Sequence, residues 1–360
     1  MARNSIGKNL VLTSFGESHG AGVGAVLDGF PAQFTVDFSA IDRQMARRRP
    51  GQSKWTTPRS ESDEIQLLSG VFEGQTTGAP LAFFIANKEQ KSSDYEPLAH
   101  LYRPGHADLM YEAKYGHRDH RGGGRSSARI TAAWVAAGSL AQQWLEKKGI
   151  VIRAWVHQIH NIAMGPVNEL PALNDIESNP VRCPDSQTAQ SMIHAIEFAQ
   201  EQGDSVGGII AFRAEGLPMG IGEPVFGKIQ AELGHYLLNI NATTGLEFGT
   251  GFEAASLKGS QHNDSWIPSP THRATSASNH SGGSIGGMTT GLPLYGKLAF
   301  KPVSSIRMEQ QTINKQGEPV SLEVNGRHDP CVLPRAVPIV ESMLALCLMD
   351  LVLEGNTYKP

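Results

Sequence analysis

The sequence is short of cysteine, of long apolar runs and of recognisable targeting segments, and each shortage excludes a class of protein. Its only cysteines, Cys183, Cys331 and Cys347, include no CxxC pair, which argues against a disulfide framework or a structural zinc site. No run of 18 apolar residues is present, and the N-terminal residues lack the apolar core of a signal peptide. A cytoplasmic protein with no membrane partner is the simplest interpretation.

Positive charge is also in short supply, because 31 Lys and Arg face 35 Asp and Glu, for a net charge of -4. Such a chain is not drawn as a whole to nucleic acid or to anionic membranes. Any anion-binding site must therefore be local. Glycine, by contrast, is abundant at 39 residues, and its clustering indicates tight turns around ligands.

Apolar periodicity and turn residues outline the secondary structure. The spacing predicts a long loop over 102–125 and a hairpin within 70–87, and Ser39 is the expected N-cap of the first helix. Strands are predicted over 9–15, 151–156, 206–214 and 291–301, and helices over 39–49, 127–148, 188–202, 223–239 and 335–353. The order lacks a βαβ rhythm and a clear boundary, which predicts an α+β fold with residues 1–360 as one large domain.

Residues 20–25, Gly-Ala-Gly-Val-Gly-Ala, match the glycine pattern of a dinucleotide-binding loop. Such a loop must open a helix, whereas Gly29 and Pro31 follow too soon for one. A strand or a hairpin with glycine turns is therefore predicted here.

Two arginine-rich segments are candidate anion sites. The turn Arg47–Gly51, with Lys54 beyond it, is either a solvated helix end or a clamp for phosphate or carboxylate. Residues 121–129 combine three glycines, two serines and the start of a helix, where free N–H groups and the helix dipole favour an anion.

Weaker signals lie elsewhere. His106 stands between Arg103 and Asp108, where an imidazole can move a proton near neutrality. Residues 279–287, 301–305 and 326–331 add Gly, Ser, Lys and Arg turns. No metal site is predicted, since His117 and His120 form a pair without a third ligand at a recognisable spacing.

Six of these segments, in order, resemble the chorismate synthase family: Gly16–Gly20, Arg47–Gly51, Arg103–Asp108, Gly122–Arg129, Asn279–Gly287 and Gly326–Cys331. The resemblance implies a β-α-β sandwich and a homotetramer. It also implies anti-1,4-elimination of phosphate from 5-enolpyruvylshikimate 3-phosphate, a small anionic substrate, to give chorismate. The family uses reduced FMN (FMNH2) for this step without net redox change.

The same resemblance implies roles for individual residues. His19 would protonate the departing phosphate, His106 would protonate or steady the reduced flavin, and Asp329 would assist removal of the C6 hydrogen. Flavin contacts would fall on Arg125, Ser126, Ser127, Asn241, Ala242, Gly286, Lys301, Pro302, Val303, Ser304, Ser305 and Arg327. Substrate or NADP contacts would fall on Arg48, Arg49, Lys54 and Arg129, although Lys54 stands where many members have arginine.

Two rival functions stay open at this point. Arg121–Arg129 superficially resembles an RGG segment of a nucleic-acid-binding module, but aromatic residues are not interleaved with its arginines. A flavin oxidoreductase with net electron transfer is the other rival. Chains of this length resemble the members that take reduced flavin from an external flavin reductase, so that NADPH acts only indirectly.

Overall fold

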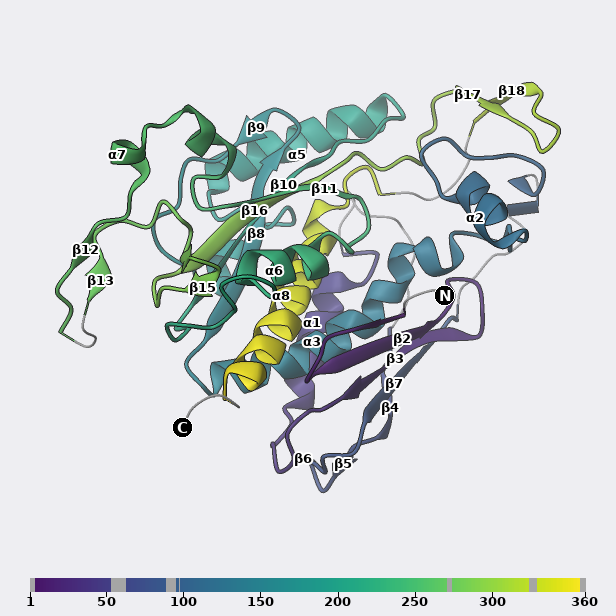
Figure 1. Ribbon diagram of the computed structural model, residues 1–360. Coiled ribbons are helices and arrows are strands. Elements are labelled where there is room, and N and C mark those ends of the chain that lie inside the picture. Colours follow the sequence, from purple (N-terminus) through teal and green to yellow (C-terminus); the bar gives the residue numbers. More distant parts are fainter. Residues whose placement is uncertain are drawn as a thin grey trace.

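The computed structural model describes residues 4–52, 63–88, 95–96, 98–270, 274–323 and 329–356, and two five-stranded antiparallel sheets frame it (Figure 1). The first sheet has the order β1 (Ser5–Ile6), β2 (Val11–Gly16), β3 (Gly22–Asp28), β7 (Leu81–Ala86) and β4 (Gln66–Ser69). The second has the order β11 (Thr243–Phe248), β16 (Leu294–Phe300), β10 (Gly208–Glu215), β8 (Val151–Ile159) and β9 (Ile162–Ala163). Of the two alternatives predicted around residues 20–25, a strand or a hairpin with glycine turns, residues 22–25 form the start of strand β3, which pairs with β2 and β7.

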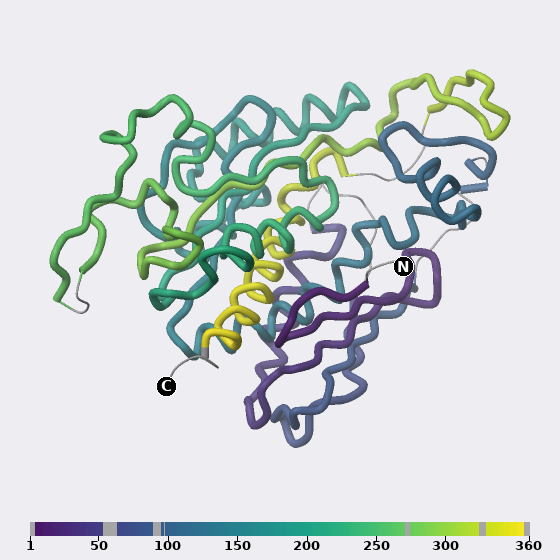
Figure 2. The backbone as a smooth tube through the Cα atoms, viewed as in Figure 1, coloured from purple at the N-terminus to yellow at the C-terminus, as the bar shows by residue number. Residues whose placement is uncertain are grey.

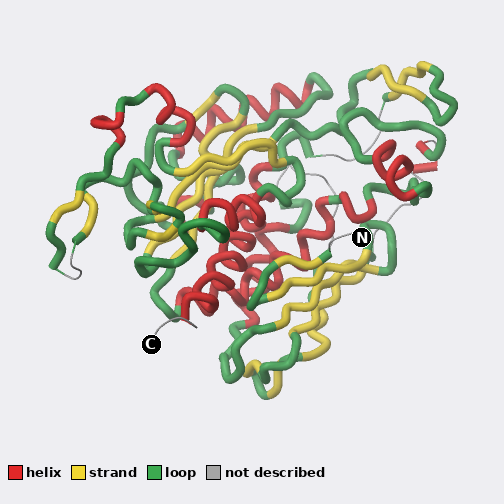
Figure 3. The backbone as a smooth tube through the Cα atoms, in the orientation of Figure 1, coloured by secondary structure: helices red, strands yellow, loops and turns green. Residues whose placement is uncertain are grey.

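A layer of helices separates the sheets, as the red helices between two yellow strand groups in Figure 3 show. Helix α3 (Thr131–Glu146) packs on β3 and β7, and α8 (Leu333–Asn356) packs on β8 and β10. The two helices also pack on each other, and α1 (Phe38–Arg48) contacts both. A Cβ on Gly138 of α3 would lie 2.3 Å from Cβ of Ser342 on α8, so only glycine permits this close approach.

Helix α8 is apolar enough over 18 residues to cross a membrane, but 94% of that window is buried inside the protein, as in a core helix. Pro338 lies inside this helix and has no N–H to donate to the carbonyl of Pro334. That carbonyl instead accepts a short hydrogen bond from Nη1 of Arg182. The helix therefore continues past its proline without an unpaired buried carbonyl.

The remaining elements surround this frame. Helix α5 (Ser186–Glu201) contacts β8 and β9, and α6 (Ile229–Leu237) contacts α8 and β11. Figure 2 shows α2 (Asp108–Tyr115) beside the hairpin of β17 (Gln310–Ile313) and β18 (Pro319–Leu322), away from both sheets. The shorter elements are β5 (Val71–Phe72), β6 (Gln75–Thr76), α4 (Leu173–Ile176), α7 (Gly259–His262), β12 (Trp266–Ile267), β13 (Thr275–Ser276), β14 (Ser284–Ile285) and β15 (Met288–Thr289).

Several predicted boundaries were wrong for identifiable reasons. Asp37, not Ser39, caps α1: its Oδ1 accepts from the Ala40 N–H at 3.1 Å and from the Ser39 hydroxyl at 2.6 Å. The predicted loop over 102–125 contains α2, whose polar sequence hides its periodicity. The helix predicted over 127–148 opens with a 3-10 turn and becomes α-helical only at Thr131, and α6 begins only at Ile229.

Candidate functional site

Loops that belong to distant parts of the sequence converge on a cavity of about 470 Å³, here called the central cavity. The end of α1, the loop before α2, the 3-10 turns before α3, the residues after α6 and β16, and the start of α8 all border it. Its polar lining residues include Arg48, Tyr95, Arg103, His106, Ser126, Ser127, Arg129, Asn241, Lys301, Ser304, Ser305, Asp329 and Arg335.

The central cavity is strongly cationic although the chain is acidic overall. Among the described residues, five Arg and Lys side chains line it against the one carboxylate of Asp329. Burial strengthens the attraction between such cations and a bound anion, because the local dielectric is lower than that of water. The cavity is therefore built for a small molecule with several negative charges.

His106 bridges two of the loops. Its Nδ1 lies 2.9 Å from the carbonyl of Pro104, which can only accept, so the proton sits on Nδ1. Its Nε2 lies 2.8 Å from the hydroxyl of Ser305, which then donates to it. Burial lowers the pKa of His106 below its ordinary value, and the positive charge of Arg103 lowers it further. The lowered pKa favours the neutral imidazole at pH 7.

The loop after β16 is tied to the loop that carries His106. Lys301 Nζ donates to the carbonyl of Gly105 at 3.2 Å and to the hydroxyl of Ser304 at 3.0 Å. The backbone N–H of Lys301 donates to the carbonyl of Ala242 at 2.9 Å. Ala242 has a φ of 68°, a left-handed conformation that is uncommon for alanine. These bonds fix the shape of the cavity wall.

Two guanidinium groups on another wall share one carboxylate. Arg48, which is buried, donates from Nη1 to Oδ2 of Asp63 at 2.7 Å. Arg129 forms a close ion pair through its Nη1 with Oδ1 of the same residue. Close by, Arg335 Nη1 donates to Oδ2 of Asp329 at 2.5 Å. The cationic side chains are therefore held by protein contacts before any ligand binds.

His19 is not among the residues that line the central cavity, but it contacts one that is. Its ring meets that of Tyr95 edge-on, with 4.8 Å between centroids, and Tyr95 lines the cavity. The side chain of His19 is buried, and a Cβ on Gly122 would lie 2.4 Å from its Cδ2. Asn87 Nδ2 lies 2.9 Å from the carbonyls of Glu17 and Gly20 and so holds the loop on which His19 stands.

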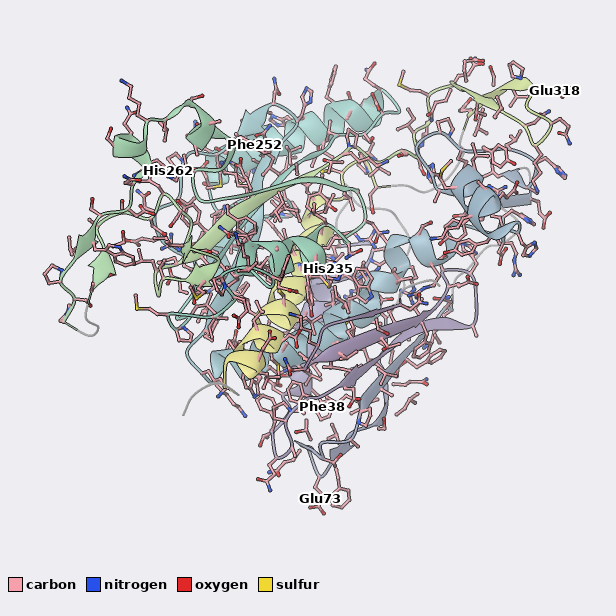
Figure 4. The ribbon with its side chains drawn as sticks, in the orientation of Figure 1. Phe38, Glu73, His235, Phe252, His262 and Glu318 are labelled. Atoms are coloured by element: carbon pink, nitrogen blue, oxygen red, sulfur yellow. The ribbon has the colours of Figure 1, made fainter. Side chains whose placement is uncertain are left out.

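A second, larger cavity of about 1060 Å³ adjoins the first and shares Ala107, Gly123, Ser126 and Asn241 with it. His235, labelled on α6 in Figure 4, belongs to its lining. Arg125 also lines this second cavity rather than the central one. Its guanidinium donates to the carbonyls of Gly16 and Ser14 at 3.0 Å, which anchors the 3-10 turn to β2.

Comparison with known proteins agrees with this geometry. Residues 10–353 match the family model for chorismate synthase. The chain is 50% identical to the chorismate synthase of Parabacteroides distasonis, over 99% of each chain. It is also 50% identical to the chorismate synthase of Porphyromonas gingivalis, over 99% of this chain and 97% of the relative. A crystal structure of chorismate synthase, 28% identical, superposes with a TM-score of 0.77 over 97% of this chain and 93% of that one.

The chain belongs to the chorismate synthase family. It is accordingly a lyase of the shikimate pathway, on the route to aromatic amino acids, and it acts on a small molecule. The α+β fold that the sequence predicted is confirmed, with antiparallel sheets on both sides of a helical layer. Of the functions that the sequence left open, family membership supports the lyase.

The structure brings together most of the residues that the resemblance to the chorismate synthase family singles out. The ones that line the central cavity are Arg48, His106, Ser126, Ser127, Arg129, Asn241, Ala242, Lys301, Pro302, Val303, Ser304, Ser305 and Asp329. Arg49 is exposed at the end of α1 and does not line it. Gly286 lies in the turn between β14 and β15, away from both cavities. Lys54 and Arg327 fall outside the described residues.

Sequence reasoning missed four residues that shape the site: Asp63, Asn87, Tyr95 and Arg335. Asp63 and Asn87 carry no motif, because each acts through a side-chain contact with a residue far away in sequence. Arg335 was counted only as the first turn of a core helix. A basic residue that opens an otherwise apolar buried helix was the one available signal, since a cation there opposes the helix dipole.

Proposed function

We propose that the chain performs the anti-1,4-elimination of phosphate from 5-enolpyruvylshikimate 3-phosphate in the central cavity, with reduced FMN bound in the same site. The observation that carries this proposal is the combination of five cationic side chains, a neutral His106 and the carboxylate of Asp329 around one cavity of about 470 Å³. The substrate has two carboxylates and one phosphate, which the cations would neutralise.

One further observation indicates that the cavity lining fits a flavin. Asn241 donates from Nδ2 to the carbonyl of Ser126 at 2.8 Å, whereas its buried Oδ1 has no hydrogen-bond partner among the described residues. A buried acceptor of this kind matches an N–H or hydroxyl donor of a flavin. The residues that would hold the cofactor are Ser126, Ser127, Asn241, Ala242 and the loop Lys301–Ser305. For Arg125, the contact with flavin would have to run through the second cavity.

The side chains would then divide the work. Arg48 and Arg129 bind substrate oxyanions, and the adjacent buried His19 supplies a proton to the leaving phosphate. Asp329, whose carboxylate accepts from Arg335, would assist removal of the C6 hydrogen. His106 accepts a proton at Nε2 when anions fill the cavity. Reduced flavin held by Ser126, Ser127, Asn241 and the loop Lys301–Ser305 would supply electron density for the elimination.

The wider setting is part of the same proposal. An external flavin reductase or another reductant would supply FMNH2, and NADPH would act only through it. The enzyme would work in the cytoplasm as a homotetramer. Residues 1–360 would form one domain, because α3 and α8 pack on each other and each covers a different sheet.

The decisive experiment supplies purified chain with reduced FMN and substrate under anaerobic conditions. Chorismate and phosphate should form in equal amounts, without consumption of the flavin. Oxidised FMN should give no product. Absence of chorismate with competent reduced FMN would overturn the proposal, and stoichiometric loss of a reduced nicotinamide with no other reductant present would indicate a built-in reductase instead.

A further inference from the structure

Asp63 is fully buried between two arginines that line the central cavity. Its side chain has 0% exposure, and those of Arg48 and Arg129 have 2% and 9%. Each carboxylate oxygen pairs with a different guanidinium: Oδ2 with Arg48 and Oδ1 with Arg129. Burial by itself would raise the pKa of Asp63, but the two positive charges outweigh it and hold the pKa below the ordinary value. The residue is therefore a carboxylate at neutral pH.

Each arginine also donates hydrogen bonds to residues other than Asp63. Arg48 donates from Nη2 to the carbonyl of Ala128 at 3.0 Å and from Nε to the hydroxyl of Thr131 at 3.3 Å. Arg129 donates from Nε to Oδ1 of Asn87 at 3.0 Å. Asp63 is the partner that the two guanidinium groups have in common. It therefore sets their position relative to each other.

The backbone of Asp63 supports this interpretation. Its φ is 48°, in the left-handed region, which aspartate tolerates better than most residues but which still costs energy. A strained conformation persists only when surrounding contacts hold it. The two ion pairs are among the contacts that hold it here.

We propose that Asp63 is a positioning residue for substrate binding, which orients Arg48 and Arg129 so that both guanidinium groups face one oxyanion of the substrate. The inference rests on the proposed function, in which these two arginines bind the substrate. Asp63 is not among the residues that line the cavity, so it would not contact a substrate bound there. Its effect is exerted through the arginines alone.

Two other roles predict different results. If Asp63 were only a counter-charge, then Asp63→Asn would leave the arginines in place, make the cavity more positive and tighten anion binding. If it were only part of the scaffold, the same change would lower Tm and leave substrate affinity unchanged. A positioning role predicts weaker substrate binding, because an amide has a single acceptor oxygen and would turn an NH2 donor toward one of the two guanidinium groups.

The test compares Asp63→Asn and Asp63→Glu with wild type in three measurements: Tm, the Kd of FMN, and the KM and kcat for 5-enolpyruvylshikimate 3-phosphate with reduced FMN. We expect KM to rise roughly 10- to 100-fold in Asp63→Asn, because this is the effect of losing one charge-assisted hydrogen bond. The change in kcat should be smaller. The Kd of FMN should stay at the wild-type value.

Asp63→Glu keeps the charge but lengthens the side chain, so it separates geometry from charge even if Asp63→Asn fails to fold. A raised KM in this variant supports positioning, and a wild-type KM overturns it. Glu177→Gln is the matched control, because Glu177 also accepts from two arginines, Arg47 at 2.7 Å and Arg182 at 3.0 Å, outside the central cavity. It should leave KM unchanged.

The outcomes distinguish this inference from the function on which it rests. Wild-type chain that forms no chorismate would reject the proposed function, whatever the variants do. Active wild type together with a wild-type KM in Asp63→Glu, or with tighter substrate binding in Asp63→Asn, would reject the positioning role alone. A lower Tm together with weaker flavin binding and a lower kcat, with KM unaltered, would mean that Asp63 only supports the fold.

Discussion

Arg335 joins Asp329 to the end of α1: its Nη1 donates to Oδ2 of Asp329 at 2.5 Å, and its Nε donates to the carbonyl of Arg48 at 3.1 Å. A planar guanidinium that bonds in two directions fixes the rotation of the carboxylate. Since Asp329 is the one carboxylate among the described residues of the cavity lining, its direction determines where a proton can be removed.

Arg335→Lys should therefore lower kcat roughly 10- to 100-fold, because a misplaced catalytic group loses most of its effect over about 1 Å. Lysine keeps the charge but cannot bond Asp329 and Arg48 at once. KM and the Kd of FMN should change little. Anaerobic stopped-flow detection of chorismate measures this, with Arg43→Lys, at an exposed position outside both cavities, as the control. Equal kcat in both variants would contradict the role of Arg335.

His106 should take up a proton when substrate binds. In the ligand-free protein its pKa is lowered by burial and by the charge of Arg103, and Lys301 adds to this effect. Bound anions offset those two charges, so the pKa rises toward neutrality. Calorimetric titration at pH 7 in two buffers of different ionisation enthalpy should show proton uptake in wild type and less in His106→Gln. Identical uptake in the two proteins would exclude His106 as the acceptor.

The same shift predicts the pH dependence of stability. A folded-state pKa below the unfolded value of about 6.5 means that the unfolded chain binds the proton first as pH falls. The contribution of His106 to stability is therefore complete above pH 6.5 or so and declines as pH falls toward the folded-state value. Urea unfolding at pH 7 and pH 5 should show a larger loss for wild type than for His106→Gln. A larger loss of unfolding free energy in His106→Gln would mean that folding raises the pKa of His106 rather than lowering it.

The sequence predicted the fold class and most of the cavity lining because those features are local. Glycine turns, the serines at the start of a helix and the Lys301–Ser305 loop are each visible in a few consecutive residues. What could not be predicted is where adjacent arginines point. Arg47 reaches Glu177 and Glu341, whereas Arg48, one position later, turns about the helix to reach Asp63. Helical geometry separates neighbours by about 100°, but the sequence does not say which face is the site.

Arg125 and Arg49 show the same limit. Both stand in motifs of the family, yet the guanidinium of Arg125 bonds carbonyls of β2, and Arg49 is exposed at the C-terminus of α1. A motif fixes where the backbone runs. The tertiary contacts that decide whether an arginine serves the fold or the ligand come from residues such as Ser14, which is more than 100 positions away from Arg125.

Asn241 offers a test of where the flavin binds. Removing its buried Oδ1 acceptor in Asn241→Ala should weaken the Kd of FMN about tenfold, the value of one hydrogen bond. Asn239 lines only the second cavity, where it donates to the carbonyl of His235. Asn239→Ala is therefore the control, and fluorescence titration of FMN measures both. A loss of FMN affinity confined to Asn239→Ala would indicate that the flavin binds in the second cavity instead.

Glu341 should stabilise the fold without serving the reaction. Its carboxylate has 1% exposure, forms a close ion pair with Arg47 and accepts from the N–H of Ala154 at 3.0 Å, so it joins α8 to α1 and β8. Glu341→Gln should lower the free energy of unfolding by about 3 kcal/mol, because a buried guanidinium loses its partner. The second partner of Arg47, Glu177, keeps the loss from being larger. Urea unfolding of Glu341→Gln, Arg47→Met and the double variant should show coupling between the two positions. Additive losses of unfolding free energy would mean that the ion pair itself contributes nothing to stability. The kcat should match wild type in every variant that folds.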